Sequence, residues 1–198
     1  MTNKVKIGNT KISITTGQIM SRVTAKQEAG DEVTERRKVI IPRAINPDGS
    51  ITVEELPEES LRVEPDPGKI TRSGDIVIKL STPYDAAIVD ETTEGCIVPS
   101  FCAIIRNDSE IDNGYLLAFL NSKECKAQLM RQVAGGVMTI LSVGKIKNVD
   151  MPVPPLSRQV DIGNAFFESK AKINTIKRIM ELEAKRNDAL IEELVREA

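Results

Sequence analysis

The residue types that most often carry out catalysis are scarce in this sequence. It contains no histidine, which removes both the commonest general base and the commonest metal ligand. Cys96, Cys102 and Cys125 lack the CxxC spacing of a zinc or redox site, and we expect them to be reduced and half-buried. The acidic pairs 54–55 and 58–59 lie in a polar, proline-flanked stretch without the apolar pocket that a general acid needs. We therefore expect a protein without catalytic residues, metal or cofactor of its own.

Recognition of DNA is a second kind of chemistry that the sequence suggests, through residues that stand at the ends of apolar runs. Loops at strand ends are where a rigid sheet presents recognition groups. Arginine and lysine can read guanine in the major groove, and hydroxyls can bond phosphates or base edges. For each such residue the alternative is an ordinary exposed side chain. The candidate DNA-binding residues are Thr16, Gly17, Arg22, Arg36, Arg37, Arg43, Lys79, Ser81, Tyr84, Gly136, Thr139, Lys145 and Lys147.

Two short motifs among these candidates have alternative interpretations. Ser81-Thr-Pro-Tyr84 is similar to the Asp/Asn-Pro-Pro-Tyr/Phe loop that holds the target base in amino-methyltransferases, but it has one proline instead of two. No glycine-rich turn for S-adenosylmethionine precedes it, so we expect a turn or surface loop there. The basic run Arg36-Arg37-Lys38 either grips phosphates or is a solvated loop, because acidic residues lie just before it.

The composition of the 198 residues fits a globular protein with one hydrophobic core and an appendage, since 40% are hydrophobic and 28% charged. No apolar run approaches the roughly 20 residues of a membrane span, and the start has no signal-peptide core, so we expect a cytoplasmic protein. The net charge of -2 provides no overall basic field, so DNA binding must depend on a local patch. Few aromatic residues and no tryptophan argue against stacking of single-stranded nucleic acid.

Short runs rich in Ile and Val, separated by turn residues, predict strands in the first two thirds of the chain. The expected strands are Val5–Ile14, Lys38–Pro42, Ile51–Leu56, Asp75–Leu80, Ala87–Val89 and Ile97–Ile105. Asn46-Pro-Asp-Gly49 is a strong turn signal. Apolar residues at helical spacing predict two small helices, near 113–121 and 122–134, the second closed by glycines 135 and 136. The predicted class is α+β, with a mixed β domain and small helices rather than alternating βαβ units.

Three prolines within Met151-Pro-Val-Pro-Pro-Leu156 exclude helix and predict a stiff hinge. We place the boundary there, with a recognition domain over 1–155 and a helix over 156–198 that Ser157 would cap. At 1.5 Å per residue this helix would be about 60 Å long.

Apolar residues spaced alternately by four and three give this helix a heptad seam, with polar breaks at Ser169 and Glu183. The seam predicts a coiled-coil arm that pairs with a second copy of the chain, and Asn187 is the kind of residue that fixes register. The alternative is an amphipathic helix folded back on its own domain. The predicted seam residues are Ile162, Phe166, Ile173, Ile176, Met180, Asn187, Leu190 and Leu194.

The order of these features resembles one half of the DNA-specificity subunit of type I restriction–modification systems, a target-recognition domain followed by a conserved spacer helix. The segments that carry the resemblance are 12–17, 73–78, 98–105, 113–122, 135–142 and 151–159. The last of them, prolines followed by Gln159 at the opening of the long helix, is the most specific. Two departures are Arg158, where the family usually has an acidic residue, and the presence of one half instead of two in tandem.

The resemblance implies a non-catalytic subunit that reads one half of a bipartite site in double-stranded DNA. It implies modification subunits as partners, which carry S-adenosylmethionine and methylate adenine, and restriction subunits in some complexes. In the family the two spacer helices run antiparallel, so together with the seam it predicts a homodimer that reads an interrupted palindrome. The competing hypotheses are a dimeric scaffold or decoy that docks modification subunits without binding DNA, and an autonomous enzyme.

Overall fold

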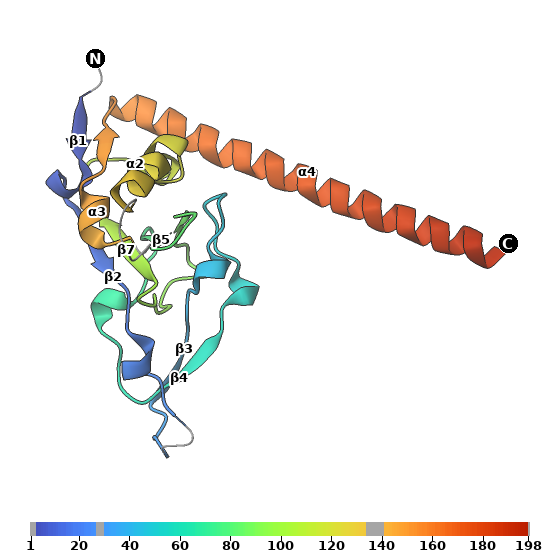
Figure 1. Cartoon of the computed structure of the whole chain (residues 1–198), viewed down its shortest axis with the longest axis horizontal. Coiled ribbons are helices and arrows are strands. Elements are labelled where there is room, and N and C mark those ends of the chain that lie inside the picture. Colours follow the sequence, from blue (N-terminus) through green and yellow to red (C-terminus); the bar gives the residue numbers. More distant parts are fainter. Residues whose placement is uncertain (1–2, 27–29, 134–140, 198) are drawn as a thin grey trace.

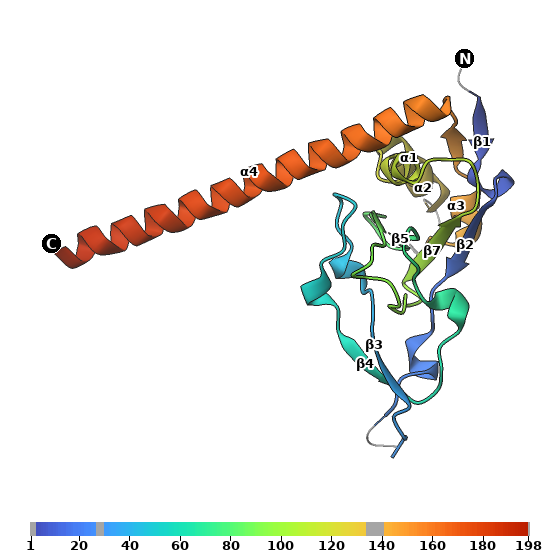
Figure 2. The same cartoon turned by 180° about the vertical axis from the view of Figure 1, so that it is seen from behind.

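A computed structural model describes residues 3–26, 30–133 and 141–197 of the chain. They form a head of strands and short helices, from which one helix, α4 (Leu156–Glu197), extends alone (Figure 1). The view from behind shows the same separation between the head and the far part of α4 (Figure 2). The α+β class and the long C-terminal helix expected from the sequence are confirmed.

The centre of the head is a four-stranded antiparallel sheet in which both faces are buried. Its strands, in spatial order, are β2 (Ile12–Thr16), β7 (Cys102–Asn107), β5 (Ile76–Lys79) and β6 (Ala86–Ile88). Side chains alternate between the two faces of a strand. Ile76 and Ile78 therefore join one apolar cluster, while Val77 joins another on the opposite face. Burial on both sides explains why β5 reads as a continuous apolar run instead of an alternating one.

Three short helices cover one face of this sheet. They are α1 (Asn113–Leu120), α2 (Lys123–Val133) and α3 (Val143–Lys147). Leu116 and Leu117 of α1 and Leu129 of α2 are buried in the same cluster as Ile76. Asp112 caps α1, because its carboxylate accepts the backbone N–H of Tyr115 at 2.8 Å. The two small helices that the apolar spacing predicts are confirmed.

A two-stranded hairpin, β3 (Glu35–Lys38) with β4 (Glu58–Leu61), lies in the part of the head away from α4 (Figure 1). In the register of the ladder, Arg37 stands opposite Glu59 and Lys38 opposite Glu58.

The strands predicted at Lys38–Pro42 and Ile51–Leu56 are wrong in this region. In place of the first, the observed strand β3 ends at Lys38, where the predicted strand begins. In place of the second is a short 3-10 turn, η5 (Val53–Glu55), which precedes β4. The hydrophobic pattern misses this hairpin because most residues of its two strands are charged, and only Leu61 among them is buried in the core.

A second two-stranded pair, β1 (Lys4–Lys6) with β8 (Asp150–Pro152), joins the start of the chain to the segment before α4. The strand predicted over Val5–Ile14 is interrupted by a 3-10 turn, η1 (Ile7–Asn9), where the Thr10 hydroxyl donates to the Ile7 carbonyl at 2.6 Å. The proline hinge is confirmed, since α4 begins at Leu156 directly after it. Ser157 lies within the first helical turn, so the prediction that it caps the helix is wrong.

Gln159 fastens α4 to the head and is buried, although it is polar. Its side-chain oxygen accepts the backbone N–H of Asp112 at 2.9 Å, and its side-chain nitrogen donates to the Pro154 carbonyl at 2.8 Å. One amide therefore ties together the start of α1, the proline hinge and the first turn of α4.

The next turns of α4 pack closely on α1. A Cβ atom on Gly163 would lie 3.0 Å from the carbonyl carbon of Gly114, so the two helices approach backbone to backbone. Ile162 and Phe166 pack against the apolar cluster of the head. From 171 to 196 every side chain is exposed. The predicted alternative, a helix folded back on its own domain, is therefore wrong for all but the first turns of α4, and the exact division at 155/156 stays a prediction.

Candidate nucleic-acid interface

The structure gathers several of the predicted DNA-binding residues around one hollow at the end of β2. This distal hollow has a volume of about 500 Å³ and is lined by Thr16, Gly17, Gln18, Ile19, Arg22, Asp66, Lys69 and Ser100. Three of these eight residues, Thr16, Gly17 and Arg22, were predicted from the sequence as strand-end candidates. Gln18 and Ile19 belong to the same segment, whereas Asp66, Lys69 and Ser100 come from two further segments that only folding brings to this place.

Gly17 allows β2 to end against the segment before β7. Its N–H donates to the Cys102 carbonyl at 2.9 Å, and a Cβ atom at this position would lie 2.2 Å from the Pro99 carbonyl oxygen. Only glycine permits such an approach. The neighbouring Gln18 exchanges backbone bonds with Val98 and Ser100 on either side of that proline. The floor of the distal hollow is thus a rigid crossing of two chain segments.

The polar groups of the distal hollow are mainly donors. Lys69 donates from Nζ to the Thr16 carbonyl at 2.7 Å, which places a cation on the rim of the hollow. Arg22 is exposed at the end of the 3-10 turn η2 (Met20–Arg22). One carboxylate, Asp66, also lines the hollow, but it accepts the backbone N–H of Gly68 at 2.8 Å in its own turn. Two cations beside hydroxyl and amide groups form a surface suited to phosphates and base edges.

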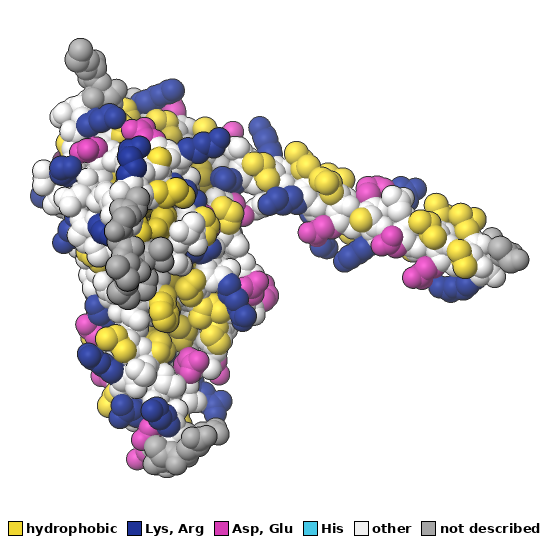
Figure 3. Space-filling model, in the orientation of Figure 1, with side chains coloured by type: hydrophobic (Ala, Val, Ile, Leu, Met, Phe, Trp, Pro, Cys, Tyr) yellow, Lys and Arg dark blue, Asp and Glu magenta, His cyan; other side chains and the backbone are white. Residues whose placement is uncertain are grey.

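The hairpin next to this hollow carries further basic residues, of which Arg36 is exposed. Arg37 is turned inward, where it pairs with Glu35 at 2.6 Å and donates to the Gly95 carbonyl at 3.0 Å. Lys and Arg side chains are prominent at the lower end of the head, with acidic ones among them (Figure 3). Arg36 therefore remains available to a ligand, whereas Arg37 holds two segments of the head together.

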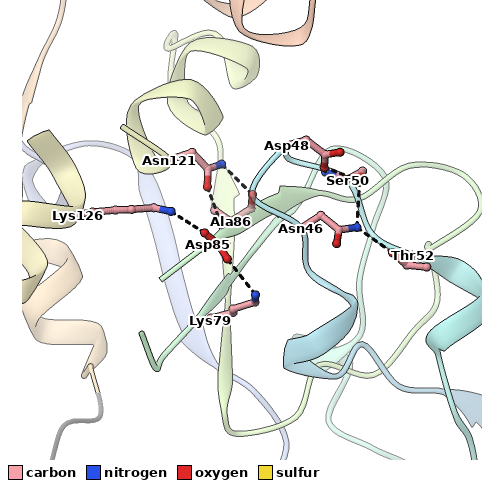
Figure 4. A network of polar contacts seen from close by, with 9 residues as sticks. All are labelled: Asn46, Asp48, Ser50, Thr52, Lys79, Asp85, Ala86, Asn121 and Lys126. Carbon is pink, nitrogen blue, oxygen red and sulfur yellow. Dashed lines mark hydrogen bonds and ion pairs between the residues drawn. The ribbon is translucent and has the colours of Figure 1, made fainter. Parts of the chain in front are cut away.

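Lys79 is placed in a buried ionic cluster instead of on an open surface. It donates to Asp85 at 3.0 Å, and Lys126 of α2 donates to the other oxygen of the same carboxylate at 2.5 Å (Figure 4). Asp85 is only 4% exposed. Burial raises the pKa of Asp85, but the hydrogen bonds and charges of Lys126 and Lys79 outweigh it, so the net shift is downward. This cluster ties β5 to α2, and it gives Lys79 a structural contact that its sequence position does not reveal.

The Ser81–Tyr84 segment forms a turn, as its composition predicts. The N–H of Tyr84 donates to the Ser81 carbonyl at 2.9 Å, and Ser81 remains exposed. Tyr84 is only 2% exposed and packs in the core of the head. The prediction that places Tyr84 among surface recognition residues is therefore corrected, because the turn directs its ring inward.

The remaining candidates lie apart from the distal hollow. Arg43, which is 73% exposed, stands on the short turn η4 (Pro42–Ala44) at 3.7 Å from Glu55. Lys145 and Lys147 lie on α3, which packs near η1 and β2. Gly136 and Thr139 fall outside the described residues. The structure thus brings together Thr16, Gly17 and Arg22 but not the whole predicted set.

The predicted seam of α4 divides into two parts. Ile162 and Phe166 are covered by the head, whereas the six members from Ile173 to Leu194 are exposed. Met180, for example, is 66% exposed. Further exposed apolar residues that the seam prediction did not include are Ile179, Leu182, Ile191 and Val195. Apolar side chains recur along the free part of α4 (Figure 3), a pattern typical of a surface that another helix covers.

Sequence reasoning missed Gln18, Lys69 and Ser100. Gln18 and Ser100 stand next to glycine and proline at the ends of apolar runs, which was a usable signal. Lys69 lies 53 residues from Thr16 in the sequence, in the turn η6 (Pro67–Lys69), and only the fold brings the two together.

Across 3–26, 30–133 and 141–197, no group of three or more acidic or cysteine side chains is arranged to hold a metal ion. Over the same ranges, no helix is both long enough and apolar enough to cross a bilayer.

No protein-family model matches this sequence, and no curated protein matches it. Solved structures do match its fold. The HsdS subunit from Thermoanaerobacter tengcongensis superposes with a TM-score of 0.64 at 18% identity, over 93% of this chain and 45% of that one. A chain from a structure titled for complex assembly and conformational transition of the type I R-M system superposes with a TM-score of 0.65 at 19% identity. That match also covers 93% of this chain and 45% of the other.

These matches concern the fold. Head and long helix together are similar to about half of an HsdS chain, so the half-length architecture expected from the resemblance is confirmed. The chain spans less than half the length of the solved chains that it matches.

Proposed function

We propose that this chain is the DNA-recognition subunit of a type I restriction–modification complex, in which each head reads one half of a bipartite site in double-stranded DNA. The observation that carries the proposal is the match of head and helix together, over 93% of the chain, to an HsdS subunit. A head alone would suit many binding proteins. A head joined rigidly to a helix of 42 residues suits a protein that must hold two heads apart.

In this proposal the distal hollow and the exposed Arg36 of the hairpin face the DNA. Arg22 and Lys69 contribute phosphate or guanine contacts, and Thr16 and Ser100 contribute hydroxyl groups. The rigid crossing at Gly17 supports them, so that little conformational freedom is lost when DNA binds. Catalysis belongs to partner modification subunits that carry S-adenosylmethionine, restriction subunits join in a restricting complex, and the complex works in the cytoplasm.

The free part of α4 is proposed to pair with the same part of a second copy, in antiparallel orientation. A parallel pair in register would place the Glu183 carboxylate of one copy against that of the other. An antiparallel pair in which Glu183 faces the second copy's Asn187 lets the amide donate to the carboxylate, twice by symmetry. Met180 then faces Leu190 and Ile176 faces Leu194, so the flanking layers are apolar.

Two heads related by a twofold axis imply a palindromic target with an unread gap. The test is a selection of bound sequences from random duplexes, with the chain and its modification subunit together. We expect two inverted half-sites at one dominant spacing. Enrichment of a single half-site would contradict the dimer, and no enrichment at all would contradict DNA recognition.

A second candidate function is a dimeric scaffold that docks modification subunits without binding DNA. The net charge of -2 favours it, because nothing in the overall charge attracts a polyanion. A pull-down that recovers modification subunits while every DNA mobility shift stays negative would select this function.

A further inference from the structure

The turn that the motif Asn46-Pro-Asp-Gly49 forms reaches from the head to the middle of α4. Asn174 of α4 donates from Nδ2 to Asp48 Oδ2 at 2.6 Å, and Lys170, one turn earlier, adds a favourable charge near the same carboxylate. Every described side chain of α4 beyond this point, up to 196, is exposed. Among the described residues, the hydrogen bonds and ion pairs of α4 beyond Asn174 all lie within the helix, so the bond between Asp48 and Asn174 is the last polar contact between head and helix.

The turn is internally rigid. Asp48 Oδ1 accepts both the backbone N–H and the hydroxyl of Ser50, at 2.9 and 2.6 Å. Asn46 donates to the hydroxyl of Thr52 at 2.8 Å and to that of Ser50 at 3.2 Å (Figure 4). Burial raises the pKa of Asp48, but its bonds from Ser50 and Asn174 and the charge of Lys170 outweigh it and lower the pKa overall. Asp48 is therefore ionised near neutral pH and accepts from Asn174.

The turn is also anchored to the core. The carbonyl of Gly49 accepts the backbone N–H of Ile88 in β6 at 3.0 Å. Gly49 has a φ of +88° and lies against Leu117 and Phe166, which would be 2.9 and 3.1 Å from a Cβ atom there. The turn is thus held among the sheet edge, α1 and the underside of α4.

Two supports therefore hold α4, and their separation makes the second one matter. The first support is the packed stretch from the buried Gln159 to Phe166, and the second is the contact between Asp48 and Asn174. Gln159 and Asn174 are about 22 Å apart along the helix, and about 35 Å of helix extends beyond Asn174. A small displacement at Asn174 is thus enlarged at least about two and a half times at the tip of α4.

We propose that the Asn46–Gly49 turn is a brace that sets the angle between head and helix, and thereby the distance between the two heads of the dimer. Asp48 and Asn174 are its positioning residues, and neither contacts DNA. The part of the proposal that concerns spacing rests on the proposed function, whereas the part that concerns the angle does not.

The angle between head and helix is tested by double electron–electron resonance between two spin labels on the full chain. One label is attached at Glu94→Cys on the head and the other at Glu193→Cys on α4, and the labelled chain is diluted with unlabelled protein. The three native cysteines are buried, and burial raises the pKa of each thiol, so the label selects the introduced ones. We expect a narrow distance distribution that broadens or shifts in Asn174→Ala and Asp48→Ala. Alanine favours helix more than asparagine does, so Asn174→Ala keeps α4 folded.

Asn164→Ala, which removes the same side chain from an exposed position of α4 outside the brace, is the matched control and is expected to leave the distribution unchanged. Distributions in Asn174→Ala and Asp48→Ala identical to the parent would overturn the brace.

The spacing is tested by repeating the selection from random duplexes with Asn174→Ala and its control. We expect the parent and Asn164→Ala to enrich duplexes with one gap length between the half-sites. We expect Asn174→Ala to enrich duplexes with at least two gap lengths. An unchanged gap in Asn174→Ala would overturn the link to spacing. If the parent enriches no duplex, the proposed function is wrong. The distance distributions then still test whether the Asn46–Gly49 turn sets the angle of α4.

Discussion

At the scale of single residues, the most consequential group in the head is Asp85, a buried carboxylate that two lysines share. Replacing it with asparagine leaves Lys79 and Lys126 facing each other without an anion in a largely buried place. Breaking a buried ion pair in this way costs about 3 kcal/mol of the free energy of unfolding. We expect Asp85→Asn to lower stability by this order in urea unfolding, and the exposed Asp108→Asn to change it little.

The same cluster predicts how stability depends on pH. Because the pKa of Asp85 is lower in the folded protein than the usual value of about 3.9, ionised Asp85 stabilises the fold above that pH. This stabilisation is lost as the pH falls through the folded pKa. The difference in unfolding free energy between the parent and Asp85→Asn should therefore be largest near pH 7 and shrink below pH 4. A difference that stays constant from pH 7 to pH 3 would show that folding does not lower the pKa of Asp85.

Arg22 is the residue on which the proposed DNA contact is most directly tested. It is exposed on the rim of the distal hollow, so its loss removes a cation without removing core packing. Arg22→Ala should weaken specific DNA binding by about 1–3 kcal/mol and leave the thermal unfolding midpoint unchanged. Arg72→Ala, exposed outside the hollow, serves as the control in the same binding titration. Equal DNA affinities of the two variants would show that the distal hollow is not part of the DNA interface.

At the scale of secondary-structure elements, Gln159 explains why the prolines and the glutamine of the hinge occur together. The prolines end β8 and leave the Pro154 carbonyl free to accept, and the glutamine side chain binds it and the start of α1 at once. Neither bond is visible in the sequence, although the motif that makes them is.

Gln159→Ala should therefore loosen the junction between helix and head. It leaves the partly buried N–H of Asp112 without its acceptor, which costs about 1 kcal/mol. Hydrogen exchange is the sensitive measurement, since amides in the first turns of α1 and α4 should lose protection while those of β5 keep it. Arg158→Ala, at the exposed neighbouring position, should alter neither region.

At the scale of the whole molecule, the exposed apolar face of α4 is the feature that an isolated chain does not explain. Ile176 lies on that face and belongs to the predicted seam, whereas Ala189 lies on the opposite side of the helix. Ile176→Asp should convert a dimer into a monomer in light scattering at micromolar concentration, and Ala189→Asp should not. A chain that is monomeric before any substitution would contradict the homodimer. Phe166, although on the seam, is unsuitable for this test because it packs on its own head.

The sequence by itself determined the parts of this protein that depend on local chemistry. Proline cannot lie in the interior of a helix, so the run of prolines at 152–155 determines the hinge and the start of the long helix after it. Apolar residues at helical spacing determine α1, α2 and the seam of α4, because periodicity needs no knowledge of neighbours.

Only the tertiary structure decided which residues share a surface. Lys69 reaches Thr16, and Asp48 reaches Asn174, across stretches of chain that no local pattern links. Lys79 and Tyr84 stand in turn-rich sequence like any exposed residue, yet partners from other elements bury them. Contacts between distant segments depend on how the sheet brings their ends together, and that arrangement is a property of the packed chain rather than of any short stretch of it.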